Sequence, residues 1–279
     1  METLQIGTTT RQVPSTWNEL TRPQLRQVLA ELYAGPPAGS RLRLLAILTG
    51  FRLPLLSGLP ADVLAQLLPL TDFVLSEDHC LTAQLLPTLK VPGRHVTEPV
   101  ATLHGPRASL SNVTFGEFIF ADTFFLQYHL ATKKARLNNR ATYLDQFLAV
   151  LYRPSKRNPN PEAPDWNGDV RIAFNENHLE ARTPRLAPVP DLDKLAVLTW
   201  YRGCRQQLAS EFPDVFTVAD EHEAGPQKAP EWERVLRKLS GGVFGPVQQT
   251  ATQPLRLVLA EMQDAAVEYL RLKHPSKTA

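Results

Sequence analysis

The fold is decided by residues 112–153, which read NVTFGEFIFADTFFLQYHLATKKARLNNRATYLDQFLAVLYR. Thr114 and Glu117 form a T-x-x-E capping box, in which the threonine hydroxyl accepts a backbone N–H and the glutamate reaches back to the cap. This pattern predicts a helix from Thr114 to about Ala135. Apolar side chains recur at helical spacing along one side of this helix, at Phe115, Phe118, Ile119, Phe125, Leu126 and Leu130. Phe120 and Phe124 occupy the other side. A helix that is apolar on most faces is expected to be the hub of the core.

A second apolar helix is predicted directly after the first, from Arg140 to about Tyr152. The pair Asn138-Asn139 separates the two helices in this interpretation, and such a short connection favours an antiparallel pair. The following stretch, residues 153–168, contains four prolines and three asparagines. Because these residues favour turns and interrupt regular structure, we expect an exposed Pro-rich loop there.

Helical spacing, caps and breakers predict the remaining elements. Further helices are expected at Thr21 to about Tyr33, Arg41–Thr49, from Pro60, Asp191 to about Phe212, Glu231–Leu239 and from Pro254. Residues 4–13 favour a strand or hairpin. Prolines and β-branched residues within 81–110 favour a small β subdomain, with a hairpin around Lys90–Leu103. The fold class expected is therefore mainly α, a single multi-helix globular domain over residues 1–279 with a small β-hairpin element.

The composition is that of an ordinary globular protein, with 43% hydrophobic and 21% charged residues and a net charge of +2. That net charge is too small to argue for nucleic acid or a membrane surface. Cys80 and Cys204 are the only cysteines, which excludes a disulfide framework and a four-thiolate zinc site within one chain. The first ten residues lack the features of a secretory signal, and no apolar stretch reaches membrane-spanning length. A cytoplasmic protein, or a component of a virion-like particle, is expected.

Motifs for cofactors and metals are not found. None of the fourteen glycines makes G-x-G-x-x-G or a P-loop, and the richest cluster, residues 241–245, follows a helix as a terminator does. The seven histidines show no spacing that would bring two imidazoles to one ion. In Asp78-His79-Cys80, three ligand types stand in a row, but consecutive side chains point apart. The sequence therefore predicts no cofactor, no metal site and no catalytic residue, and favours a protein that is not an enzyme.

Asp122 and His129 are the candidate buried polar pair, because both fall within the apolar stripe of the first helix. Seven residues correspond to about 10.5 Å of helical rise, so each needs a partner from another element. One interpretation is an acid/base site in a cleft. The other, which we favour, is two satisfied core groups, since no Ser, Cys or second carboxylate can be assigned to the same place.

Charge is distributed unevenly along the chain. Residues 131–158 carry a local balance of +6, and the candidate basic surface consists of Lys133, Lys134, Arg136, Arg140, Lys156 and Arg157. Residues 211–233 hold seven acids. The two segments could attract each other within a chain or between copies. Nucleic-acid binding is disfavoured, because it needs stacking aromatics interleaved with the basic groups and the nearby rings have core-directed spacing.

A resemblance is carried by several strings of the sequence. Residues 14–21 read P-x-x-W-x-E-L-T, and further similar strings are Leu110–Phe118, Ala121-Asp122-Thr123 and Leu151-Tyr152-Arg153-Pro154. In these the chain resembles uncharacterised phage and prophage proteins encoded in tail-gene clusters. The resemblance implies a non-enzymatic assembly or structural role with protein partners, such as tail components or further copies of the chain, and it supplies no active-site residues. The alternatives are an enzyme with an unrecognised site around Asp122 and His129, and a nucleic-acid-binding protein that uses the basic surface.

Overall fold

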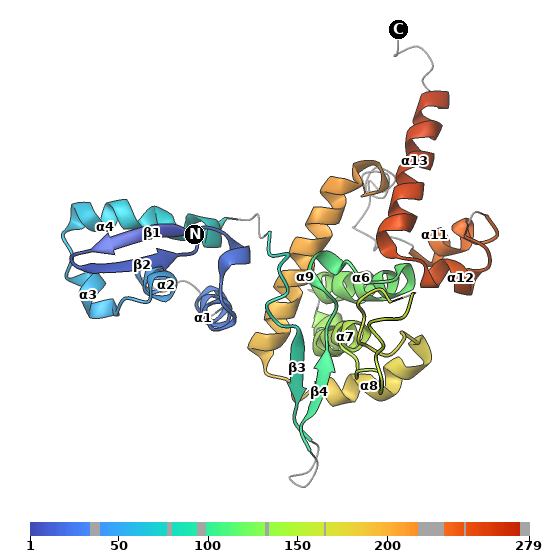
Figure 1. The fold of residues 1–279 in the computed structure, drawn as a ribbon, viewed down its shortest axis with the longest axis horizontal. Coiled ribbons are helices and arrows are strands. Elements are labelled where there is room, and N and C mark those ends of the chain that lie inside the picture. Colours follow the sequence, from blue (N-terminus) through green and yellow to red (C-terminus); the bar gives the residue numbers. More distant parts are fainter. Residues whose placement is uncertain are drawn as a thin grey trace. The chain divides into compact units, whose positions relative to one another are not determined.

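The computed structural model describes residues 1–33, 40–76, 80–93, 99–131, 134–164, 166–216, 232–242 and 244–273 (Figure 1). Helices dominate the described residues, and the sheets are two small antiparallel pairs, β1-β2 and β3-β4. The predicted mainly α fold with a small β-hairpin element is confirmed. Contacts divide the chain into two compact units, unit 1 with residues 1–86 and 190–206, and unit 2 with residues 87–189 and 207–279. The expectation of a single domain over residues 1–279 stays a prediction.

Unit 1 begins with the hairpin β1 (Glu2–Ile6) and β2 (Thr9–Val13), whose turn contains Gly7 at φ +60°. Its other elements are η1 (Trp17–Glu19), α1 (Arg22–Tyr33), α2 (Ser40–Thr49), α3 (Leu53–Ser57), α4 (Ala61–Leu67), η2 (Leu68–Thr71) and α5 (Asp72–Leu75). Helix α9 (Asp191–Glu211) starts in unit 1 and ends in unit 2. The indole of Trp17 donates to the Phe73 carbonyl (2.9 Å) and that of Trp200 to the Thr82 carbonyl (3.1 Å). These bonds satisfy the polar edge of two buried rings, as buried tryptophan requires.

Unit 2 contains the hairpin β3 (Thr88–Val91) and β4 (Ala101–His104), which falls within the predicted β region. The other elements are η3 (Ala108–Leu110), α6 (Phe115–Leu130), α7 (Lys134–Leu151), η4 (Glu176–His178), α8 (Leu179–Leu186), α11 (Trp232–Leu239), α12 (Val247–Thr252) and α13 (Leu255–Lys273). Helix α6 packs against α7, α11, α12 and α13, and α7 also packs against α8 (Figure 1). The aromatic helix is therefore the hub of this unit, as its apolar faces predict.

The boundary between α6 and α7 differs from the prediction. Helix α6 ends at Leu130 and α7 begins at Lys134, so Asn138 and Asn139 lie inside α7 and do not separate two helices. Intrinsic propensity disfavours asparagine in helices only weakly, and tertiary packing overrides it. Here the buried residues near the end of α7, such as Phe147 and Leu148, supply that packing.

The Pro-rich stretch is largely exposed over residues 154–164 and 166–167, as predicted. Arg153 is the exception, because only 1% of its surface is accessible. The expectation of an exposed loop from residue 153 onward is wrong at this residue. A buried arginine needs acceptors around it, and these lead to the polar centre of unit 2.

Candidate functional site

Arg153 lies directly after α7 and is held by its backbone and its side chain. Its backbone forms an antiparallel bridge with His104, with N–H to carbonyl distances of 2.8 and 3.0 Å. The guanidinium donates through Nε to the Ile172 carbonyl (2.8 Å) and through Nη1 to the Val150 carbonyl (2.7 Å). Its Nη2 forms an ion pair with Oε1 of Glu117. The side chain thus joins α6, the end of α7 and the segment around residue 172.

Arg171 occupies the same buried region from another segment. Its Nε and Nη2 donate to the two carboxylate oxygens of Asp169, both at 2.8 Å, in the bidentate geometry that suits arginine. Nη1 donates to the Leu151 carbonyl (2.9 Å), and Nη2 lies 3.3 Å from Oε2 of Glu117. Both guanidinium groups therefore converge on one glutamate.

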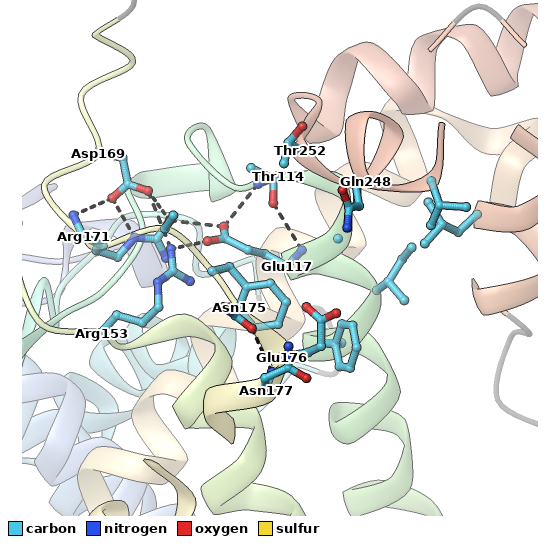
Figure 2. A pocket seen from close by; sticks show the side chains of 18 of the residues that line it. Thr114, Glu117, Arg153, Asp169, Arg171, Asn175, Glu176, Asn177, Gln248 and Thr252 are labelled. Atoms are coloured by element: carbon cyan, nitrogen blue, oxygen red, sulfur yellow. Dashed lines mark hydrogen bonds and ion pairs between the residues drawn. The ribbon is translucent and has the colours of Figure 1, made fainter. Parts of the chain in front are cut away.

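Glu117 both caps α6 and forms ion pairs with two arginines. It forms the predicted capping box, since its backbone N–H donates to Thr114 Oγ1 (3.3 Å) while its Oε2 accepts the Thr114 N–H (3.2 Å). The same carboxylate also receives Arg153 and Arg171 (Figure 2). We call Glu117, Arg153, Asp169 and Arg171 the buried ion cluster. It contains two cations and two anions, so the charges compensate one another within the unit.

The pKa values of the two buried arginines are shifted in opposite directions. Burial lowers the pKa of Arg153 to about 10, an effect that Glu117 opposes and Arg171 reinforces. Burial alone would also lower the pKa of Arg171, but Glu117 and Asp169 more than compensate and raise it. Both guanidinium groups stay charged at neutral pH. The arrangement is suited to holding three chain segments together and not to moving protons.

A cavity of about 630 Å³ lies beside the cluster, between α6, residues 167–177 and the helices α11 and α12 (Figure 2). We call it the α6–α12 cleft. Besides the four cluster residues, its lining includes Ile119, Phe120, Lys156, Asn167, Phe174, Asn175, Glu176, Asn177, Leu236, Val247, Gln248 and Thr252. The cluster therefore forms part of its wall, and no residue of the candidate pair Asp122 and His129 belongs to it.

Asp122 is buried, as predicted, and its Oδ2 accepts a hydrogen bond from Nε1 of Trp232 in α11 (2.9 Å). The rings of Phe115, Phe118 and Phe216 pack edge-on against this indole, with centroid distances of 6.3, 5.3 and 6.2 Å. Asp122 is thus a satisfied core group that attaches α11 to α6.

His129 is exposed, so the prediction of a buried Asp122 and His129 pair is wrong. The imidazole belongs to the last turn of α6 and packs on the rings of Phe125 (4.5 Å) and Tyr128 (5.3 Å). A position can follow the apolar spacing of a helix and still lie beyond the neighbours that cover the rest of it.

The predicted basic surface is only partly described. Lys133 lies outside the described residues, and Lys134 and Arg136 are placed only as part of α7. Arg140 and Arg157 are exposed, and the guanidinium of Arg140 lies 4.4 Å from the Tyr128 ring centroid. Lys156 is half-buried, lines the cleft and lies 5.3 Å from the Trp166 ring.

The net charge of +6 that residues 131–158 carry is not all located at the surface. One of its seven cations, Arg153, is buried in the ion cluster and is not part of any surface. The charge count along the sequence therefore overstates the positive charge that a nucleic acid would meet.

Sequence reasoning missed the buried ion cluster. Its only local signal is Asp169-Val170-Arg171, in which the two charges stand two apart and so share one side of an extended segment. Glu117 was recognised for its cap alone. Nothing local indicates that Arg153 and Arg171, 36 and 54 positions further along the chain, reach the same carboxylate.

Neither a family model, nor a curated protein, nor a solved structure matches the chain. Within the described residues, no three His, Cys, Asp or Glu side chains come together as a metal site would require. Each helix in the same part of the chain is too short or too polar to cross a membrane. The functional argument consequently starts from the geometry of the two units.

Proposed function

We propose that this protein is a non-enzymatic assembly or structural factor of the phage or prophage type, which acts through protein–protein contacts. The observation that carries the proposal is the apolar end of α13. Tyr269, Leu270 and Leu272 expose 62%, 41% and 76% of their surfaces. The C-terminal half of this helix extends beyond α11 and α12, whereas Leu255, Val258 and Leu259 in its first half are buried (Figure 1).

The exposed residues continue a pattern that starts in the core. Val258, Met262, Ala265, Tyr269 and Leu272 follow one another at intervals of four and three, the spacing by which helices pack side by side. We call Met262, Ala265, Tyr269 and Leu272 the α13 seam. Large exposed apolar groups in a contiguous stripe are typical of surfaces that bind another protein.

A second copy of the chain is the occupant that the charges of α13 favour. Glu261, Asp264 and Glu268 are exposed along the helix, and by sequence the basic residues Arg271 and Lys273 close it. In an antiparallel pair, the acidic part of one helix faces the basic end of the other. Such a helix is complementary to itself, and opposite charges at the edge of an apolar seam set the partner and the register.

The interior of unit 2 supports a non-catalytic role. The charges of the buried ion cluster are matched to one another, and Asp122 is bonded to Trp232 while His129 is exposed. This disfavours the enzyme alternative, because Asp122 and His129 do not form a buried acid/base pair. The nucleic-acid alternative is weakened as well, because Arg153, one of the cations of residues 131–158, is buried. The strings that resemble tail-cluster proteins contain Trp17, Glu117, Asp122 and Arg153, each of which holds the fold together through a long-range bond.

Sedimentation velocity of the full chain over a concentration series tests the proposal. We expect reversible self-association that Leu272→Asp weakens at least tenfold, about 1.4 kcal/mol, because the charge must be buried in the seam. Leu53→Asp is the matched control, since Leu53 is an exposed leucine (41%) at the start of α3 in unit 1. A wild-type protein that stays monomeric throughout, or association that Leu272→Asp leaves unchanged, contradicts the proposal.

A further inference from the structure

The α6–α12 cleft has the size and lining of a binding site. We infer that it holds an extended, uncharged peptide segment of a partner protein, with one bulky apolar side chain inserted between α6 and α11–α12. This inference rests on the proposed function, since it names a second surface through which an assembly factor would bind a partner. The cleft volume of about 630 Å³ falls within the range of roughly 300–1,000 Å³ that is usual for ligand pockets.

One side of the cleft is apolar. Ile119 and Phe120 come from α6, Phe174 from the segment before η4, and Leu236 and Val247 from α11 and α12. The rings of Phe120 and Phe174 pack against each other with centroids 5.3 Å apart and an angle of 56° between them. Aliphatic groups and ring edges together suit a branched or aromatic side chain.

Amide side chains also line the cleft. Asn167, Asn175, Asn177 and Gln248 line the cleft, and Figure 2 shows the last three placed around its interior. A carboxamide carries both donors and an acceptor, the same combination that each peptide unit presents. Oδ1 of Asn175 already accepts the Asn177 N–H (2.9 Å), which leaves its NH₂ group to donate to a carbonyl. These groups match a peptide backbone.

The charges of the lining cancel. Arg153, Lys156 and Arg171 stand against Glu117, Asp169 and Glu176, and four of these six belong to the buried ion cluster. Without a net charge the cleft has no preference for a phosphate or another anion. The cluster also fixes this wall before any ligand arrives, and a preorganised wall reduces the entropy that binding costs.

Selection from a displayed library of random linear peptides tests the inference on the immobilised full chain. The most enriched peptide is then synthesised with acetylated and amidated ends and titrated by fluorescence anisotropy. We expect enriched peptides to share one bulky apolar residue flanked by uncharged residues. Val247→Asp should weaken peptide binding at least tenfold, because it puts a charge on the apolar wall. Gln248→Ala should weaken peptide binding severalfold, because it removes an amide that can bond to the peptide backbone.

Val100→Asp is the matched control, because Val100 is another exposed valine of unit 2 (59% against 45% for Val247) and does not line the cleft. It should leave the affinity unchanged. No shared motif, or equal binding to wild type and Val247→Asp, overturns the inference. The inference is also overturned if the wild-type protein binds a saccharide on an oligosaccharide array and Val247→Asp does not.

The outcomes separate this inference from the proposed function. Loss of peptide binding in Val247→Asp with unchanged self-association supports the cleft as a site of its own. Peptide binding that depends on Val247 in a chain that never self-associates removes the α13 argument and keeps the cleft. Self-association through α13 in a chain that binds no peptide keeps the proposed function and removes the cleft as a peptide site.

Discussion

Glu117 and Asp122 are two buried carboxylates on one helix, five residues apart, and their surroundings differ. Glu117 lies among two arginines and a second carboxylate. Asp122 lies among aromatic rings and accepts the N–H of a neutral indole. The first site joins carboxylates to guanidinium groups, whereas the bond from Trp232 at the second joins a carboxylate to the N–H of an indole. The difference teaches that α6 is held to its neighbours by two kinds of bond.

Each site also joins a different part of the chain to α6. The buried ion cluster connects its first turn to the end of α7 and to residues 169–172. The Asp122 bond connects its middle to α11, 110 positions further along the chain. Breaking one site at a time separates their contributions to the stability of unit 2.

The largest effect is expected from Glu117→Gln. The substitution keeps the shape of the side chain and leaves two buried arginines facing Asp169 alone, which should lower the free energy of unfolding by about 3–5 kcal/mol. Urea unfolding followed by circular dichroism measures it. Glu176→Gln in the same cleft is the control, and because Glu176 is exposed it should change stability by less than about 0.5 kcal/mol. A loss below about 1 kcal/mol for Glu117→Gln would mean that the cluster is not a charge-compensated unit.

A smaller effect is expected from Trp232→Phe. The ring still packs against Phe118, but the N–H that Asp122 accepts is lost, which should cost about 1–3 kcal/mol. The same urea titration measures it. Trp166→Phe, at a half-buried tryptophan over Lys156, serves as the control and should stay within about 0.5 kcal/mol. Equal losses in the two variants would show that the indole N–H adds nothing.

The smallest effect is expected from the coupling between the two sites. Glu117 and Asp122 are separated by about 7.5 Å along the helix axis, and sites at such distances are nearly additive. A double-mutant cycle of Glu117→Gln and Trp232→Phe should therefore give an interaction energy within about 0.5 kcal/mol. A coupling well above 1 kcal/mol would mean that α6 carries one continuous polar network, and the contrast between the two sites would disappear.

Local patterns predicted much of the fold. The Thr114–Glu117 capping box appears with both of its hydrogen bonds, and α1, α2 and α9 begin within about one residue of the predicted starts. The connection between α6 and α7 was misplaced, because a weak asparagine signal was given more weight than packing. Helix α8 was missed, since Pro184 inside it breaks the expected pattern.

The candidate site was predictable only in part, because its bonds join distant segments. Helical spacing placed Asp122 in the core correctly and His129 incorrectly, since periodicity does not reveal where neighbouring elements stop covering a helix. Arg153 was counted in the charge balance of residues 131–158 and placed at the start of an exposed loop, because its sequence neighbours are basic and Pro-rich. Its true surroundings are Glu117, Val150 and Ile172.

The sequence by itself indicated where α1, α2, α6 and α9 begin, which faces are apolar and that short β elements interrupt a mainly helical chain. These properties depend on interactions within about four residues, which any short window contains. Only the tertiary structure decided that Glu117 meets Arg153 and Arg171, that Trp232 reaches Asp122, and that the end of α13 is exposed. Such contacts depend on how whole elements pack, and a buried charge reveals its partner only when the chain has brought the two together.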